Sequence, residues 1–103
     1  MTNPCRGEVA ITLDGVPHVM RLTLGALAEL EARLEIGSLV ALAEKFESGS
    51  VSSSELISLI AAGIKGAGGS LGESDVAEAD IDGGAVGAMR AGFALMSAAF
   101  GQD

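Results

Sequence analysis

The sequence predicts an α+β fold in which an N-terminal two-stranded antiparallel hairpin packs on a bundle of about four to five helices. Two alternating apolar runs meet at Asp14-Gly15, which predicts the hairpin. From Leu24 onward, apolar residues recur at helical spacing between glycine-containing breaks. We expect one domain over residues 1–103, with residues 1–7 disordered, a hairpin over 8–22 and helices over 23–100.

The turn fixes the register of the hairpin. Asp14-Gly15 suits a two-residue type I′ turn, because both central residues of that turn need positive φ. Such a turn pairs Leu13 with Val16 and Val9 with Met20, and the apolar residues of both strands then share one face. A lone hairpin is marginal in water, so we expect this face to pack on the helices.

Pro17 predicts a free edge. It stands opposite Thr12 at a pair without hydrogen bonds, where its missing N–H points away from the partner strand. The outer edge of the second strand is therefore predicted to be unpaired at that end.

Apolar spacing and capping residues predict the helices. Thr23, Ser38 and Ser52 are candidate N-caps, and Ser52 has capping-box spacing to Glu55. Gly37 and Gly49 are placed to end the first two helices. The expected helices run from Leu24 to about Glu35, Leu39 to about Glu47, Ser54 to about Lys65, Asp75 to about Asp80, and about Ala85 to Phe100.

Two of these helices carry more apolar surface than one face needs. The helix at 54–65 is apolar almost all round, so we expect it to be central, with burial under a partner as the alternative. The last helix has a seam of large apolar residues at spacing 3, 4, 3, 4, which we expect to dock on the core, with a partner contact as the alternative. The seam comprises Val86, Met89, Phe93, Met96 and Phe100. The candidate partner-binding residues on the two helices are Leu56, Ile57, Ile60, Met89, Phe93 and Met96.

Charge and composition argue against several classes of function. The net charge is −8 with six Lys and Arg, which disfavours nucleic acid and anionic membrane surfaces as partners. The longest apolar run, 59–64, is too short to span a bilayer, and the N-terminus has no signal-peptide pattern. We therefore expect a cytoplasmic protein.

The chain shows no pattern typical of an enzyme or a cofactor site. His18 is the only histidine and Cys5 the only cysteine, so neither a metal site nor a cofactor is predicted. A small enzyme or toxin-like regulator would need Cys5 and His18 in contact, as a nucleophile and its base. We expect a non-catalytic binding or assembly protein instead.

Several segments together resemble one family. They are N-P-x-R-G-E-V at 3–9, L-D-G at 13–15, R-L-T-L-G-A-L-A-E-L-E at 21–31, L-V-A-L-A-E-K-F-E at 39–47, L-I-x-L-I-A-A-G at 56–63 and D-G-G at 82–84. In these segments the chain resembles the tail assembly chaperone-like proteins of gene transfer agents and related phage tails, some of which are described as phage tail tube proteins.

The resemblance implies a non-catalytic role in building a phage-like tail inside a bacterial cell. Chaperones of this kind are thought to coat the tape-measure protein until tail tube subunits polymerise round it, which makes the tape-measure and tail tube proteins the implied partners. The alternative is a structural component of the tail, either a tube or a tail-tip subunit. Homo-oligomerisation stays open, and the resemblance implies no catalytic residues.

Overall fold

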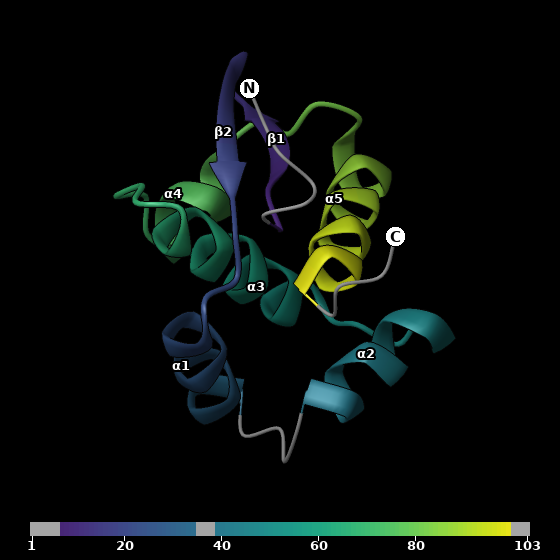
Figure 1. The fold of residues 1–103 in the computed structure, drawn as a ribbon. Coiled ribbons are helices and arrows are strands. Elements are labelled where there is room, and N and C mark those ends of the chain that lie inside the picture. Colours follow the sequence, from purple (N-terminus) through teal and green to yellow (C-terminus); the bar gives the residue numbers. More distant parts are fainter. Residues whose placement is uncertain (1–6, 35–38, 100–103) are drawn as a thin grey trace.

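A computed structural model describes residues 7–34 and 39–99 of the chain. Within these residues the chain forms a two-stranded hairpin followed by five helices, which confirms the α+β fold (Figure 1). In chain order the elements are β1 (Val9–Leu13), β2 (Val16–Met20), α1 (Leu24–Leu34), α2 (Leu39–Ser48), α3 (Ser53–Gly66), α4 (Glu73–Glu78) and α5 (Gly84–Ala99). The disorder predicted for residues 1–7 falls almost wholly outside the described residues.

The hairpin forms in the predicted register. Leu13 pairs with Val16 and Val9 with Met20, and the turn places Asp14 at φ 52° and Gly15 at φ 78°. The face that carries the larger apolar residues packs inward, so that Leu13 and Met20 are buried. Val16 lies beside the turn, beyond the reach of the helices, and stays exposed.

The outer edge of β1 is covered at its turn end by residues 80–82. The backbone N–H of Asp14 donates to the carbonyl of Asp80 over 2.8 Å, and the N–H of Asp82 donates to the carbonyl of Thr12 over 3.1 Å. The Asp14 carboxylate also accepts the N–H of Asp80 over 2.8 Å. The segment between α4 and α5 therefore adds a short stretch of antiparallel pairing to β1, which joins two parts of the chain that lie far apart in the sequence.

The outer edge of β2 pairs with no strand among the described residues, as predicted. The register turns the backbone groups of Pro17, Val19 and Arg21 toward this edge. Proline has no N–H, and the N–H of Arg21 donates to the carbonyl of Gly63 in α3 over 2.8 Å. Val19 therefore carries the one outward N–H of β2 that is left for another strand.

The centre of the fold is α3. It contacts α1, β2, α4 and α5, so the prediction of a central helix is confirmed (Figure 1). Its N-terminus has the predicted capping box: the Glu55 N–H donates to Ser52 Oγ over 3.1 Å, and the Ser52 N–H donates to Glu55 Oε1 over 2.9 Å. Leu59, Ile60 and Ile64 are almost fully buried along it.

Two glycines of α3 let neighbouring segments approach its backbone closely. A Cβ at Gly63 would lie 2.7 Å from Leu95 Cδ2 and 3.0 Å from Met20 Cβ. A Cβ at Gly66 would overlap the carbonyl oxygen of Arg21, just after β2. The hairpin and α5 therefore sit against α3 at a distance that larger residues would not allow.

The first two helices follow the sequence pattern. The Ala26 N–H donates to Thr23 Oγ1 over 3.0 Å, which confirms Thr23 as a cap, and Leu27 and Leu30 are buried along α1. Gly49 follows α2 with φ 73°, as expected for a residue that ends a helix. The roles predicted for Gly37 and Ser38 lie outside the described residues.

The short acidic helix begins and ends earlier in the sequence than predicted. It was expected from Asp75 to about Asp80, but α4 begins at Glu73 and ends at Glu78. Gly72 is its N-cap, and the Asp75 carboxylate accepts the Gly72 N–H over 2.9 Å. The helix cannot continue to Asp80 because the backbone there pairs with Asp14 beside β1.

Candidate partner-binding face

The six predicted partner-binding residues lie at very different depths. Ile60 and Met96 belong to the core, with exposures of 1% and 3%. Leu56, Ile57 and Met89 are half-buried, and Phe93 is 51% exposed. Ile60 and Met96 are therefore inaccessible to a partner in the folded chain, whereas Phe93 faces solvent.

The large exposed apolar residues of α5 gather on one side of the helix. Val86 is 65% exposed and Phe93 is 51% exposed, seven residues apart and thus on the same face. Arg90 is exposed between them, and half-buried Met89 lies at the margin of this group. We call this group of Val86, Met89, Arg90 and Phe93 the α5 outer face.

The prediction of which side of the last helix faces the core was wrong. The buried side of α5 is formed by Ala88, Gly92, Leu95 and Met96, and of these only Met96 was on the predicted seam. Leu95, which is fully buried, was missed, while Val86 and Phe93 point outward. Phe100 lies outside the described residues.

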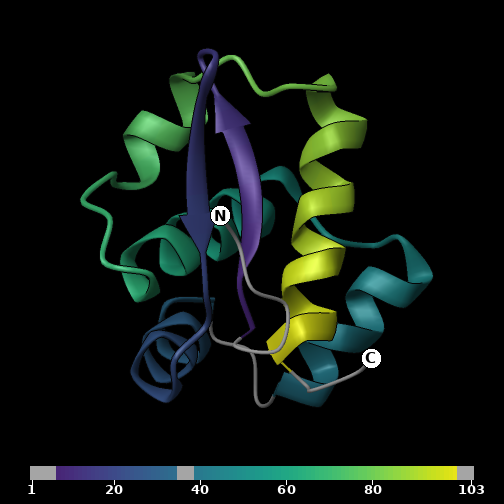
Figure 2. The ribbon, with the colours of Figure 1, turned by 45° about the horizontal axis from the view of Figure 1, so that its top comes forward.

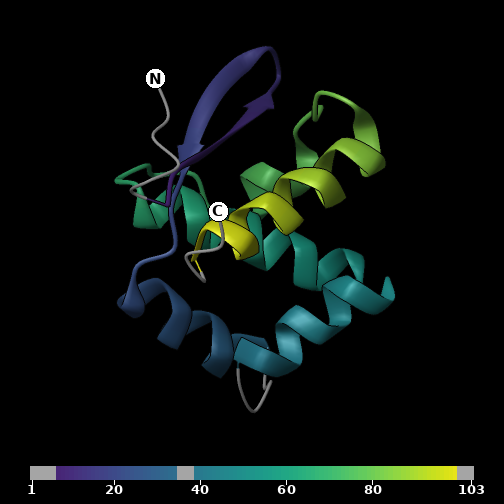
Figure 3. The same cartoon turned by 45° about the vertical axis from the view of Figure 1, so that its right-hand side comes forward.

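Small residues explain why α5 turns this way. At Gly92 a Cβ would lie 2.8 Å from Leu56 Cδ1 and 3.0 Å from Phe46 Cε1, so any larger residue would require these side chains of α3 and α2 to shift. Ala88 is 3% exposed on the same side. In Figure 2 and Figure 3, α5 runs alongside β1 and across α3. Close approach through the small residues leaves the bulky residues at 86 and 93 on the far side of the helix.

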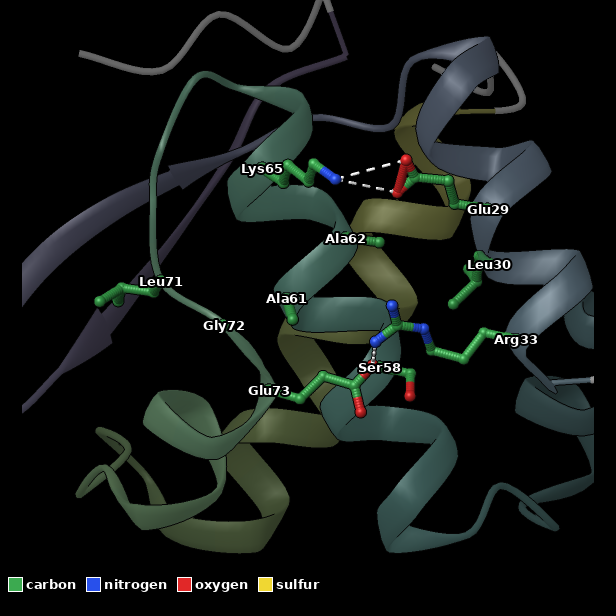
Figure 4. Close-up of a pocket in the computed structure, with 10 residues that line it drawn as sticks. All are labelled: Glu29, Leu30, Arg33, Ser58, Ala61, Ala62, Lys65, Leu71, Gly72 and Glu73. Atoms are coloured by element: carbon green, nitrogen blue, oxygen red, sulfur yellow. Dashed lines mark hydrogen bonds and ion pairs between the residues drawn. The ribbon is translucent and has the colours of Figure 1, made fainter.

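A shallow depression lies between α1, α3 and the chain just before α4 (Figure 4). It encloses about 180 Å³, below the roughly 300 Å³ at which small-molecule pockets begin. Its rim carries two ion pairs across elements, Lys65 with Glu29 at 3.2 Å and Arg33 with Glu73. Because each pair is electrically neutral and solvent-exposed, the depression has no net charge to attract an ionic ligand, and the pairs link α1 to its neighbours.

Ionisable groups cluster at the start of α3 as well. Lys45 in α2 forms an ion pair with Glu55, and the backbone N–H of Ser52 donates to the same carboxylate. These two contacts lower the pKa of the Glu55 carboxyl below its usual range, the Lys45 hydrogen bond having the larger effect. Glu55 therefore has a structural role, because it both caps α3 and ties α2 to it.

Of the two residues considered for chemistry, the structure describes only His18. His18 is half-buried on the hairpin opposite Ile11, and Cys5 lies outside the described residues. Over residues 7–34 and 39–99, no group of three or more His, Cys, Asp or Glu side chains is arranged to hold a metal ion. In the same residues no helix is long and apolar enough to cross a bilayer.

Comparison with known proteins identifies the family of the chain. No curated protein and no solved structure matches the chain. Residues 6–102, nearly the whole chain, match one family, described as "Phage tail tube protein, GTA-gp10". The chain therefore belongs to this GTA-gp10 family of phage tail tube proteins.

Proposed function

We propose that this protein is a non-catalytic assembly chaperone of a phage-like tail, and that it binds the tape-measure protein through the α5 outer face. It would act in the cytoplasm of the bacterial cell that produces the particles. The observation that carries the proposal is the exposure of Val86 and Phe93, at 65% and 51%, on a helix whose opposite side is anchored in the core. A large apolar residue exposed beside others is typical of an interaction site.

The chemistry of α5 suits a helical client. The apolar residues of the α5 outer face, Val86, Met89 and Phe93, stand at i, i+3 and i+7, the spacing at which one helix meets another. Half-buried Met89 adds a side chain that adapts to irregular apolar surfaces. A face of this kind could shield an amphipathic helix of the tape-measure protein without a catalytic group.

The alternative is a structural subunit of the tail tube, and the family's description favours it. A tube built by pairing strands between subunits needs accessible strand edges. Here the outer edge of β2 has one outward N–H left at Val19, since Pro17 lacks an N–H and Arg21 donates to Gly63. The turn end of β1 is covered by residues 80–82. The scarcity of free backbone N–H groups on the strand edges supports a chaperone rather than a tube assembled by pairing of strands.

Mass spectrometry of purified particles separates the two functions. A chaperone leaves the finished particle, so the protein should be absent or far below the tube subunit in amount. Presence in stoichiometric amounts would refute the chaperone proposal and establish a structural subunit.

Co-purification with the tape-measure protein tests the proposed site. Phe93→Asp should fold normally, because the side chain is half exposed, and should lose binding because it replaces a large apolar side chain of this face by a charge. Val40→Asp is the matched control, since Val40 is 64% exposed on α2. Undiminished binding by folded Phe93→Asp would exclude the α5 outer face.

A further inference from the structure

The α5 outer face contains one charged residue, Arg90, for which the described residues supply no ion pair. Of the five Lys and Arg residues that the structure describes, three form an ion pair with a glutamate, namely Arg33, Lys45 and Lys65, whereas Arg21 and Arg90 form none. Arg90 is exposed, and no carboxylate among the residues the structure describes lies within ion-pair distance of it. It is also the only charged residue of α5. The chain has 14 Asp and Glu against six Lys and Arg, yet none of the described carboxylates forms an ion pair with Arg90.

Helical geometry places Arg90 within the apolar group. It follows Val86 by four residues and precedes Phe93 by three, and residues at both spacings are neighbours on a helix surface. The stretch from Val86 to Phe93 spans about 10 Å along the axis at 1.5 Å per residue. A partner that covers Val86 and Phe93 must therefore also cover Arg90, and must supply a group for the guanidinium to bind.

We infer that the α5 outer face binds a partner helix that presents apolar side chains to Val86 and Phe93 and a carboxylate to Arg90. The inference rests on the proposed function and names the chemistry of the client segment. A guanidinium removed from water needs a hydrogen-bonding partner, and a carboxylate fits its planar donors with two parallel bonds. An apolar or basic segment would leave Arg90 buried and unpaired or would repel it.

The rest of the protein makes this contact selective. The net charge of −8 disfavours an acidic client at long range, although salt screens charges more than about 8 Å apart under physiological conditions. A carboxylate is therefore favoured only where it reaches Arg90. The contact would fix the register of a client helix on α5, since apolar residues alone allow the helix to slide.

Binding of the full-length tape-measure protein by Arg90 variants tests the inference. Arg90→Glu should weaken binding by roughly 30-fold or more, as expected when one member of a buried charge pair is replaced. Lys65→Glu is the matched control: it makes the same change in net charge at an exposed residue away from α5, and should bind like the unaltered protein. A thermal melt of each variant confirms that it folds.

Chemical cross-linking then identifies the carboxylate. In the Arg90→Lys variant a water-soluble carbodiimide can join the lysine amine to a carboxylate in contact with it. We expect a cross-link to an Asp or Glu of the tape-measure protein flanked by apolar residues at spacing three or four. Replacing that residue by Lys should restore binding to Arg90→Glu.

The outcomes separate the inference from the proposed function. If Phe93→Asp loses binding while Arg90→Glu binds normally, the carboxylate is excluded and the proposed site stands. If both variants bind normally, the α5 outer face is not the site. A cross-link that joins two copies of this chain, and none to the tape-measure protein, would overturn the inferred occupant.

Discussion

Replacing Gly66 by Ala tests whether close backbone approach, rather than helix propensity, controls the end of α3. Alanine is the better helix former by about 1 kcal/mol, so propensity alone predicts a gain in stability. In the structure, however, a Cβ at Gly66 would overlap the carbonyl oxygen of Arg21 and lie 3.2 Å from its carbonyl carbon. Because the obstacle is backbone, it cannot be relieved by a change of rotamer.

The size of the effect follows from what must move. Displacing Arg21 strains its hydrogen bond to Gly63, now 2.8 Å, which is worth about 1 kcal/mol. Overpacking in a closely packed region typically costs about 1–3 kcal/mol. After subtracting the gain in propensity, Gly66→Ala should lower the free energy of unfolding by about 1–3 kcal/mol. For a domain of this size each kcal/mol lowers the Tm by about 4–8 °C.

Gly25→Ala is the matched control. Gly25 is exposed in α1, and a Cβ there would come no closer than 3.9 Å to a neighbouring atom, Thr23 Oγ1. The same substitution should therefore raise the free energy of unfolding by about 0.5 kcal/mol. Urea unfolding followed by circular dichroism measures both variants. The reasoning fails if Gly66→Ala is as stable as the unaltered protein, or if the two variants shift in the same direction.

Three further predictions concern the core, the caps and pH. Leu95→Ala should lower the free energy of unfolding by about 2–5 kcal/mol, because Leu95 is fully buried. Phe93→Ala should lower it by less than about 1 kcal/mol, because Phe93 is half exposed. Thermal or urea unfolding measures both, and equal losses would contradict the orientation of α5. Ser52→Ala should cost about 1 kcal/mol by removing the Oγ acceptor of the Glu55 N–H, and an unchanged urea midpoint would show that the cap contributes nothing. Folding lowers the pKa of the Glu55 carboxyl, so the ionised carboxylate should stabilise the fold fully above the unfolded pKa of about 4.3 and less as the pH falls below that value. The difference in the free energy of unfolding between the unaltered protein and Glu55→Gln should therefore shrink between about pH 7 and pH 3. A difference that stays constant would refute the assignment.

Local sequence patterns predicted the parts of the fold that depend on neighbouring residues. The Asp14-Gly15 turn fixes the register of the hairpin because the alternation of side chains allows one pairing that puts both apolar sets on one face. Ser52 and Glu55 predicted the start of α3 because capping joins groups three residues apart. The surplus of apolar residues on α3 also predicted its central place.

The candidate site was predicted only in part. Phe93 and Met89 were identified from the spacing of large apolar residues, but the same pattern included Met96, which is buried. Apolar and small residues of α5 occur on every side of the helix, so the difference in hydrophobicity between its sides is too small to show which one faces the core. The signal that could have shown it is the row of small residues, Ala88 and Gly92 with Leu95, whose close approach to α3 fixes the rotation of the helix.

By itself, the sequence determined the hairpin and its register, the helix caps and the order of the elements, because these depend on interactions between residues close along the chain. The tertiary structure alone decided that residues 80–82 pair with β1 and that Val86, Arg90 and Phe93 face outward. Both results depend on contacts between residues far apart in the sequence. In the case of α5, the decisive contacts come from the side chains of Phe46 and Leu56, which would have to shift to admit a Cβ at position 92.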